Sequence, residues 1–482
     1  MNYPLISSMI SQIIGCAGLS LLLPLGLALV EGEPIYGFLI SIALAIGIAF
    51  LLRKQKISPH TSLTPREGTA ITALAWISVS LLYSLPYSVS GLLSPLDGLV
   101  ESISGLTGTG ATVINDLTVV PSSVLFFRSL THWIGGLGII VIFVALFPQA
   151  GRGTTKMVNA ESTGPTASKA LPRIKETAMA LFSVYFAFTA ICAIAYMVWG
   201  MRFWEAIDHS FSTIATGGFS TRNESVAYYH SISLELLMVF FMMISSANFG
   251  IYVKAWKRGF HVIWEDTEFK VYVCIVGLST LLLTVLLVLQ SSMPWGTSLR
   301  ESLFQAVSIS SSTGFVSADF DQWPSAAKFI LLLIMIIGGC GGSTAGGLKV
   351  IRLILLGKSF MSLLRLHIHP RAVLHLTVGK ETFSENTAFQ VLTFFFIYIS
   401  LSALWAVCFM WDGIAFLDAI GVAFSTMSNA GPAFGQFGAT CTYASLPDFS
   451  KAIVCLSMLF GRLESITLLA ICMPSFWKRS GW

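Results

Sequence analysis

The chain has 482 residues, of which 55% are hydrophobic and only 11% are charged. A soluble domain carries roughly 25% charged residues, so this composition excludes a soluble protein and indicates one that crosses a membrane several times. The net charge of +4 requires no nucleic-acid partner, because Lys and Arg beside membrane spans account for it.

Apolar stretches that approach the ~20 residues needed to span hydrocarbon as a helix recur along the whole chain. The first is too long, and too soon followed by a second, to be a cleaved signal peptide. The stretches occupy residues 5–29, 36–52, 70–93, 124–147, 178–199, 234–256, 271–289, 329–337 with its continuation, 387–409 and 452–473.

Most of the 28 Lys and Arg residues lie between alternate apolar stretches. Positive residues are enriched in cytoplasmic loops, so we expect these segments and both chain termini on the cytoplasmic side. The residues are Arg53, Lys54, Lys56, Arg66, Arg152, Lys156, Lys169, Arg173, Lys175, Lys254, Lys257, Arg258, Lys270, Lys349, Arg352, Lys358, Arg365, Arg371, Lys380, Lys478 and Arg479.

A pattern of three residues occurs four times: a carboxylate and a serine stand 13 and 6 positions before a glycine. The glycines are 108, 96 and 117 residues apart, so the chain is predicted to be a fourfold repeat of a unit of roughly 100 residues. The copies are Asp97, Ser104, Gly110; Glu205, Ser212, Gly218; Glu301, Ser308, Gly314; and Asp418, Ser425, Gly431.

The segments before the four glycines, 96–106, 203–214, 299–310 and 416–427, are too short and too polar to cross a membrane. Non-helical backbone at membrane depth is tolerated only where it is buried in protein or lines a water-filled cavity. We therefore predict an all-α membrane protein with four repeats of helix, re-entrant pore helix, filter loop and helix around one pseudo-fourfold pore. An extra hairpin, 1–66, precedes the repeats 67–150, 151–260, 261–380 and 381–482.

The four glycine segments contain only small or uncharged side chains, so they offer backbone carbonyls rather than catalytic groups. Glycine allows the positive φ that points successive carbonyls in one direction, and four such loops can replace the hydration shell of a monovalent cation. The alternative is that the glycines are re-entrant turns in another kind of transporter. The predicted ligands are Gly108, Thr109, Gly110, Thr216, Gly217, Gly218, Ser312, Thr313, Gly314, Asn429, Ala430 and Gly431.

The repeated carboxylate and serine have structural interpretations as well as functional ones. A carboxylate at the start of a short helix caps its free amides, and four of them would also attract cations to the pore mouth. The serine hydroxyl is expected to support the loop from behind rather than to bind an ion. The eight Cys residues show no ligand spacing and are interpreted as small hydrophobic residues.

The inward helices of the repeats align at 135–138, 247–250, 338–341 and 461–464, where only the fourth copy carries a cation, Arg462. A charge in mid-membrane is costly, so Arg462 is expected either to form an electrostatic barrier below the loops or to pair with an acid such as Glu464. The third copy contains too many glycines for a continuous helix. These are Gly338, Gly339, Gly341, Gly342, Gly346 and Gly347.

The four glycine segments, the glycine run and Arg462 resemble the Trk/Ktr/HKT superfamily of cation-translocating proteins, in particular its bacterial potassium uptake subunits. The resemblance implies K⁺ at the filter residues, since all four repeats have the glycine. It also makes the glycine run an intramembrane gate rather than a passive kink. Ala111 and Pro432 replace the phenylalanine found in repeats 2 and 3, which makes the outer filter asymmetric.

The resemblance further implies a homodimer in the bacterial inner membrane, regulated by a cytosolic, nucleotide-binding RCK subunit of the TrkA type. This chain lacks a phosphate-binding loop of its own and is expected to hold no organic cofactor. The alternative is a secondary transporter that couples K⁺ entry to H⁺ or Na⁺. An enzyme is not expected, because no nucleophile or metal cluster is evident. His367, His369 and His375 fit a solvated linker better than a metal site.

Overall fold

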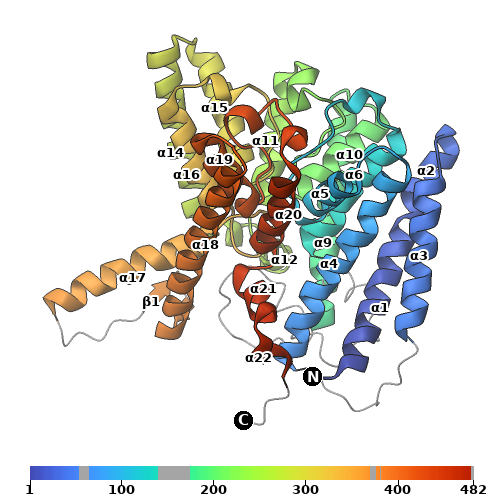
Figure 1. Cartoon of the computed structure of the whole chain (residues 1–482). Coiled ribbons are helices and arrows are strands. Elements are labelled where there is room, and N and C mark those ends of the chain that lie inside the picture. Colours follow the sequence, from blue (N-terminus) through green and yellow to red (C-terminus); the bar gives the residue numbers. More distant parts are fainter. Residues whose placement is uncertain (54–63, 139–173, 370–375, 380, 479–482) are drawn as a thin grey trace.

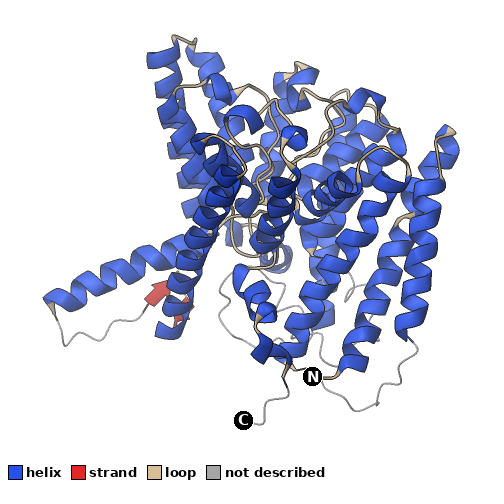
Figure 2. Cartoon of the chain, in the orientation of Figure 1, coloured by secondary structure: helices blue, strands red, loops and turns tan. Residues whose placement is uncertain are grey.

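The computed structural model describes residues 1–53, 64–138, 174–369, 376–379 and 381–478. Apart from one pair of short strands, their regular secondary structure is helical, and loops fill the centre (Figure 2). Several residues used in the sequence predictions lie outside the described ranges, as do the predicted repeat boundaries at 150/151 and 380. The residues are Lys54, Lys56, Arg152, Lys156, Lys169, Arg173, Arg371, His375, Lys380 and Arg479.

The chain begins with the predicted helical hairpin. Helices α1 (Tyr3–Ser20) and α2 (Leu22–Glu31) together have the length and hydropathy of one span, and α3 (Tyr36–Arg53) returns beside α1. Close contact is possible because Gly18 faces Ala45, where a Cβ on Gly18 would lie 2.6 Å from the alanine methyl group. The Ser11 hydroxyl also donates to the carbonyl of Ala49 over 2.7 Å.

The rest of the chain repeats one order of elements four times: a long helix, a short helix and a returning helix. Figure 1 shows these groups in successive colours around a common centre. The groups are α4 (Pro65–Val89), α5 (Pro95–Thr107) and α6 (Ser122–Leu137); α9 (Ile174–Val198), α10 (Phe203–Ile214) and α11 (Ile232–Ser245); α14 (Thr267–Ser291), α15 (Trp295–Ser310) and α16 (Ser325–Ile337); and α18 (Glu385–Trp411), α19 (Phe416–Ser428) and α20 (Asp448–Arg462).

The short helices agree closely with the four predicted segments, with one exception in the third. Asp97, Glu205 and Asp418 lie in the first turns of α5, α10 and α19. At α5 the Ser94 side chain also accepts a hydrogen bond from the backbone N–H of Asp97. Helix α15 starts at Trp295, earlier than predicted, so Glu301 lies beyond its first turn and does not cap it.

The returning helices all end at the aligned level, which corrects the prediction of unbroken spans at 234–256 and 452–473. Helix α12 (Phe249–Arg258) is bent by 88° from α11, and α21 (Ser465–Cys472) by 114° from α20. A loop separates α16 from α17 (Val350–Ile368), and α6 ends at Leu137. In the described part of the chain six helices are long and apolar enough to cross a membrane, or up to eight if each bent pair is one span.

Small elements complete the fold. The outer loops contain the 3₁₀ helices η1 (Leu117–Val119), η3 (Ser225–Tyr229), η4 (Phe320–Gln322), η5 (Gly435–Phe437) and η6 (Tyr443–Ser445). At the opposite end lie α13 (His261–Glu265), α22 (Pro474–Trp477) and the antiparallel strands β1 (Leu376–Val378) and β2 (Glu381–Phe383).

Helix α17 projects away from the other helices, with the strand pair beside it (Figure 1). The sequence analysis did not predict these strands. Val378 and Phe383 are buried together with Ile351, Leu355 and Val391, so the pair forms a small apolar cluster with α17 and α18.

Candidate functional site

The backbone at the end of each short helix follows the same path in all four repeats. Each loop has two residues with positive φ, placed two positions apart and with φ between 53° and 91°. Glycine adopts this conformation easily and Asn tolerates it, whereas Thr216 and Ser312 hold it at an energetic cost. The four pairs are Gly108 and Gly110, Thr216 and Gly218, Ser312 and Gly314, and Asn429 and Gly431.

The repeated serine anchors each loop through its backbone carbonyl. That carbonyl accepts a hydrogen bond of 2.8–3.0 Å from the residue before the glycine: Thr109, Gly217, Thr313 and Ala430. The hydroxyls differ between repeats. Ser308 donates to the carbonyl of Phe315 over 2.7 Å and Ser425 to that of Gly431 over 2.8 Å. The hydroxyls of Ser104 and Ser212 are buried without a hydrogen-bond partner among the described residues.

The four repeated glycines form a closed ring, which we call the glycine ring. A Cβ on any of them would press against a carbonyl oxygen of the next repeat. The glycines are therefore required by space as well as by φ. Gly110 faces the oxygen of Gly217, Gly218 that of Thr313, Gly314 that of Ala430, and Gly431 that of Thr109, which returns to the first repeat.

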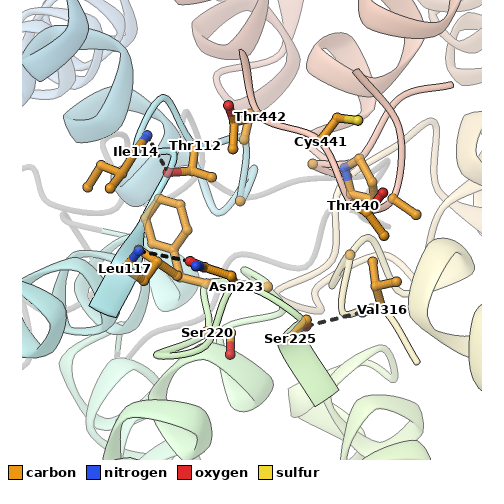
Figure 3. A pocket seen from close by; sticks show the side chains of 18 of the residues that line it. Thr112, Ile114, Leu117, Ser220, Asn223, Ser225, Val316, Thr440, Cys441 and Thr442 are labelled. Atoms are coloured by element: carbon orange, nitrogen blue, oxygen red, sulfur yellow. Dashed lines mark hydrogen bonds between the residues drawn. The ribbon is translucent and has the colours of Figure 1, made fainter. Parts of the chain in front are cut away.

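A pocket of about 120 Å³ opens directly outside the glycine ring and is lined by all four of its glycines. Figure 3 shows side chains from the outer loops of the four repeats pointing around it. Hydrogen bonds connect each outer loop to the next. They run from Leu117 N to Asn223 Oδ1 (2.8 Å), from Val316 N to Ser225 Oγ (3.3 Å), from Gly435 N to Asp321 Oδ1 (2.8 Å) and from Tyr443 N to Thr112 O (2.8 Å).

The repeated carboxylates do not line this pocket. Among its described lining residues there is no Asp or Glu, and there are two cations, Arg128 and Arg222. Asp97 pairs with Lys451 at 2.6 Å, and Glu205 pairs with Arg222. Asp116, in the outer loop of repeat 1, is a carboxylate that could attract cations to the outer face. A hydrogen bond from the Thr118 hydroxyl lowers its pKa and keeps it ionised.

Behind the glycine ring lies a buried ion pair between Arg128 and Glu101. Arg128 donates from Nε to Glu101 of α5 over 2.6 Å, and both side chains are almost fully buried. Glu101 also accepts from Val113 N at 3.0 Å, while the guanidinium stacks 4.0 Å from the ring centre of Phe219. An arginine in an apolar stretch near the end of a helix can snorkel to the surface or pair with an acid, and Arg128 pairs with an acid of a short helix. The sequence signal for Glu101 was a second carboxylate in α5, among residues that are otherwise uncharged from Gly98 to Thr107.

His132 was missed by the sequence analysis. Its Nδ1 lies 2.7 Å from the carbonyl of Gly105, and its Nε2 accepts a hydrogen bond from Phe219 N over 3.3 Å. The ring also fills the space beside Gly217, where a Cβ would collide with it. His132, which is fully buried, therefore joins the loop of repeat 2 to the short helix of repeat 1. Its sequence signal was a histidine within an apolar stretch.

Below the glycine ring, the loop between α16 and α17 lies across the ends of three short helices. We call residues 338–347 the crossing loop. The Thr344 hydroxyl contacts the carbonyls of Ile214 (3.1 Å) and Ser245 (3.2 Å), which end α10 and α11. Gly346 N donates to Ser312 Oγ at 2.5 Å, and Gly347 N to Ser428 O at 3.0 Å. Gly338, Gly342 and Gly347 have positive φ, which explains part of the glycine run.

Arg462 connects the crossing loop to the remaining repeat. Its Nη1 donates to Thr344 O over 3.0 Å, and its Nη2 donates to the carbonyls of Gly135 (2.6 Å) and Gly136 (2.7 Å) at the end of α6. Glu464, the acid named as an example in the alternative interpretation, pairs with Arg352 at 2.5 Å. Arg462 and the crossing loop, together with the helix ends that they contact, thus form a layer directly beneath the glycine ring.

A family model described as TrkH, cation transport protein, matches residues 35–478. The chain belongs to the TrkH family of cation transport proteins. It is 38% identical to a Trk system potassium uptake protein TrkH of Halomonas elongata, over 92% of each chain. With the TrkH of Escherichia coli K12 the identity is 36% over 91% of each chain.

The TrkH fold is also present in three dimensions. A crystal structure of the potassium transporter TrkH from Vibrio parahaemolyticus superimposes with a TM-score of 0.90, at 33% identity, over 99% of this chain and 100% of that one. The chain is therefore a multi-pass helical membrane protein of a transport family and not an enzyme.

Proposed function

We propose that this chain takes up K⁺ across the bacterial inner membrane through a channel-like pore on the axis of the glycine ring. The observation that carries the proposal is the closure of that ring: four loops with the same two left-handed positions contact one another in cyclic order. Backbone oxygens arranged around one axis can replace the hydration shell of a monovalent cation. The relatives named above are potassium uptake proteins, which supports K⁺ as the ion.

The predicted ligands act mainly through their carbonyls. The Thr109 hydroxyl is hydrogen-bonded to the Thr107 hydroxyl (2.7 Å) and accepts from Nδ2 of Asn429 (2.9 Å). Ser312 Oγ accepts a hydrogen bond from the crossing loop. The ends of the short helices also direct the negative side of their dipoles toward the centre, which favours a cation there. In this proposal residues 67–150, 151–260, 261–380 and 381–482 are the four repeats of one pore, and 1–66 is an added hairpin.

The crossing loop and Arg462 form the gate. Thr344, Gly346 and Gly347 hold the loop against three short helices, and Arg462 ties it to α6. A guanidinium beneath the ring repels a cation that has passed it, so opening requires Arg462 to leave its carbonyl partners. A homodimer and a TrkA-like RCK subunit on the cytoplasmic side complete the proposed assembly, with both termini on that side.

A secondary transporter that couples K⁺ to H⁺ or Na⁺ remains the second candidate, and Asp208 favours it. This side chain is buried in α10, and its Oδ1 has no hydrogen-bond partner within the described residues. A buried carboxylate is the kind of group that carries a coupling proton. If conduction is uncoupled, K⁺ influx should be independent of a proton gradient in the wild type and in Asp208→Asn alike.

The deciding experiment is a flux assay in proteoliposomes with K⁺, Rb⁺ and Na⁺ and no other gradient. K⁺ and Rb⁺ should enter and Na⁺ should be largely excluded. Gly110→Ser places a side chain against the Gly217 oxygen and should raise Na⁺ relative to K⁺ permeation. Unchanged selectivity in this variant contradicts the filter assignment, and flux that needs a second gradient favours the coupled transporter.

A further inference from the structure

Helices α12 and α13 present a surface that the proposed pore does not use. On one side of α12, Phe249, Ile251 and Ala255 are buried. On the other side aromatic side chains stand in the open: Trp256 is 87% exposed, and Phe260 and Trp264 beyond it are 76% and 66% exposed. Three exposed cations of α12 accompany them, namely Lys254, Lys257 and Arg258.

The direction of α12 suits a membrane surface. It turns by 88° from α11, so if α11 crosses the membrane, α12 lies nearly in the membrane plane. Helices in that position bury aromatic residues at the headgroup boundary and bring Lys and Arg to anionic headgroups. Lys257 and Arg258 also suit the negative end of the helix. That effect does not account for Lys254 one turn earlier or for the exposed aromatic residues.

The start of α12 is joined directly to the crossing loop. Phe249 N donates to the carbonyl of Gly342 over 3.1 Å, and Cys340 N donates to that of Ser246 over 2.9 Å. Gly342 lies so close to Asn248 that a Cβ on it would be 3.0 Å from the amide oxygen. The Tyr252 hydroxyl spans the bend to the carbonyl of Ile244 over 2.8 Å. A displacement of α12 is therefore transmitted to residues 340–342.

We infer that α12 and α13 bind anionic phospholipid headgroups of the cytoplasmic leaflet, and that this binding holds the crossing loop in its closed position. The inference rests on the proposed function for the side of the membrane and for the role of the loop. We assign the binding partner of this surface as a lipid membrane because exposed aromatic residues and cations occur together on a helix that turns out of the bundle. Headgroup binding stabilises the present bend, in which Phe249 keeps its hydrogen bond to Gly342.

The test compares K257Q/R258Q with the matched control R53Q/R365Q, which removes two exposed cations from helices α3 and α17. Both variants and the wild type are reconstituted in phosphatidylcholine vesicles with increasing fractions of phosphatidylglycerol. Retained phosphatidylglycerol is counted by native mass spectrometry, and K⁺ influx is measured in the same preparations. Thermal unfolding in detergent verifies that each variant is folded.

We expect phosphatidylglycerol to lower basal K⁺ influx in the wild type and in the control. In K257Q/R258Q the fraction of phosphatidylglycerol that halves K⁺ influx should be higher than in the wild type. The increase should be about fivefold for each charge removed, which is the effect of one cation at an anionic surface. Trp256→Gln should shift it in the same direction. The number of retained phosphatidylglycerol molecules should fall only in the α12 variants.

Three results would overturn the inference. They are influx that does not depend on phosphatidylglycerol, an equal loss of retained lipid in the control, and α12 variants that alter only the response to an added cytosolic protein. The last result would assign the surface to a protein partner. If the wild type carries no K⁺ in any vesicle, the proposed function fails, while the lipid count still tests the surface by itself.

Discussion

The glycine ring and the layer beneath it are built on opposite plans. In the ring, four loops share the same φ pattern, the same anchoring carbonyl and the same contact with the next repeat. One level below, α11 and α20 are followed by helices bent by different angles, the third copy supplies the crossing loop and the fourth supplies Arg462. Equivalent positions suit a task that all copies share, and unequal positions suit a task that one or two perform.

The strongest way to break this comparison is to replace ring glycines one at a time by alanine. In each of G110A, G218A, G314A and G431A the added Cβ presses against a carbonyl oxygen. The residue must also adopt a positive φ, and this alone costs roughly 1–2 kcal/mol for an L-residue. We expect K⁺ influx to fall by about tenfold or more in every variant, because 1.4 kcal/mol corresponds to a factor of ten.

Gly26→Ala is the matched control, since Gly26 lies in α2 with no atom near its missing Cβ. It should transport normally. If one ring variant also transports normally, the four positions are not equivalent and the ring does not act as a unit.

Arg462→Ala tests the opposite plan, because it alters one copy only. It removes three hydrogen bonds to carbonyls and the positive charge below the ring. Bonds to charged groups contribute roughly 1.5–3 kcal/mol each, so the basal K⁺ influx of the chain alone should rise by about tenfold or more. Arg462→Lys keeps the charge and loses the planar geometry, and its influx should lie between the two. Wild-type influx in Arg462→Ala would remove this residue from the gate.

Glu268 gives a smaller and more graded test of the crossing loop. Its Oε1 accepts hydrogen bonds from Gly341 N (2.6 Å) and Ile351 N (2.9 Å), which ties the crossing loop to the first turn of α17. Glu268→Ala removes this acceptor and should raise basal influx by about fivefold, the equivalent of one net hydrogen bond of roughly 1 kcal/mol. Glu268→Gln retains an acceptor oxygen and should change influx less. A larger effect from Gln than from Ala would contradict this role.

The smallest expected effects are at the repeated serines, and they refine the symmetry of the ring. Ser308→Ala and Ser425→Ala remove hydrogen bonds to loop carbonyls and should each lower the free energy of unfolding by about 1 kcal/mol. Ser104→Ala and Ser212→Ala remove hydroxyls that have no partner in the described structure, so they should be neutral or slightly stabilising. Thermal unfolding in detergent measures all four, and equal effects would show that the hydroxyls act alike.

The repeats, the short helices and the ring residues could be predicted from sequence because they depend on residue type at fixed offsets. The bends after α11 and α20 could not, because each pair of helices, taken together, still has the length and mean hydropathy of one span. The second bend places Glu464, a residue with a Cβ, at a φ of 51°, which no composition rule anticipates. The carbonyl partners of Arg462 were equally hidden, since the backbone carbonyls of Thr344, Gly135 and Gly136 carry no signal in residue type.

Because one chain supplies the whole ring, a single substitution changes a quarter of it. In a ring assembled from four identical chains, every substitution is repeated four times. One gene then cannot encode a ring in which only one, two or three positions are changed. Here Gly108, Thr216, Ser312 and Asn429 already differ at one structural position while their backbones agree. The glycine ring can therefore be altered in single steps, one repeat at a time, by natural variation or by design.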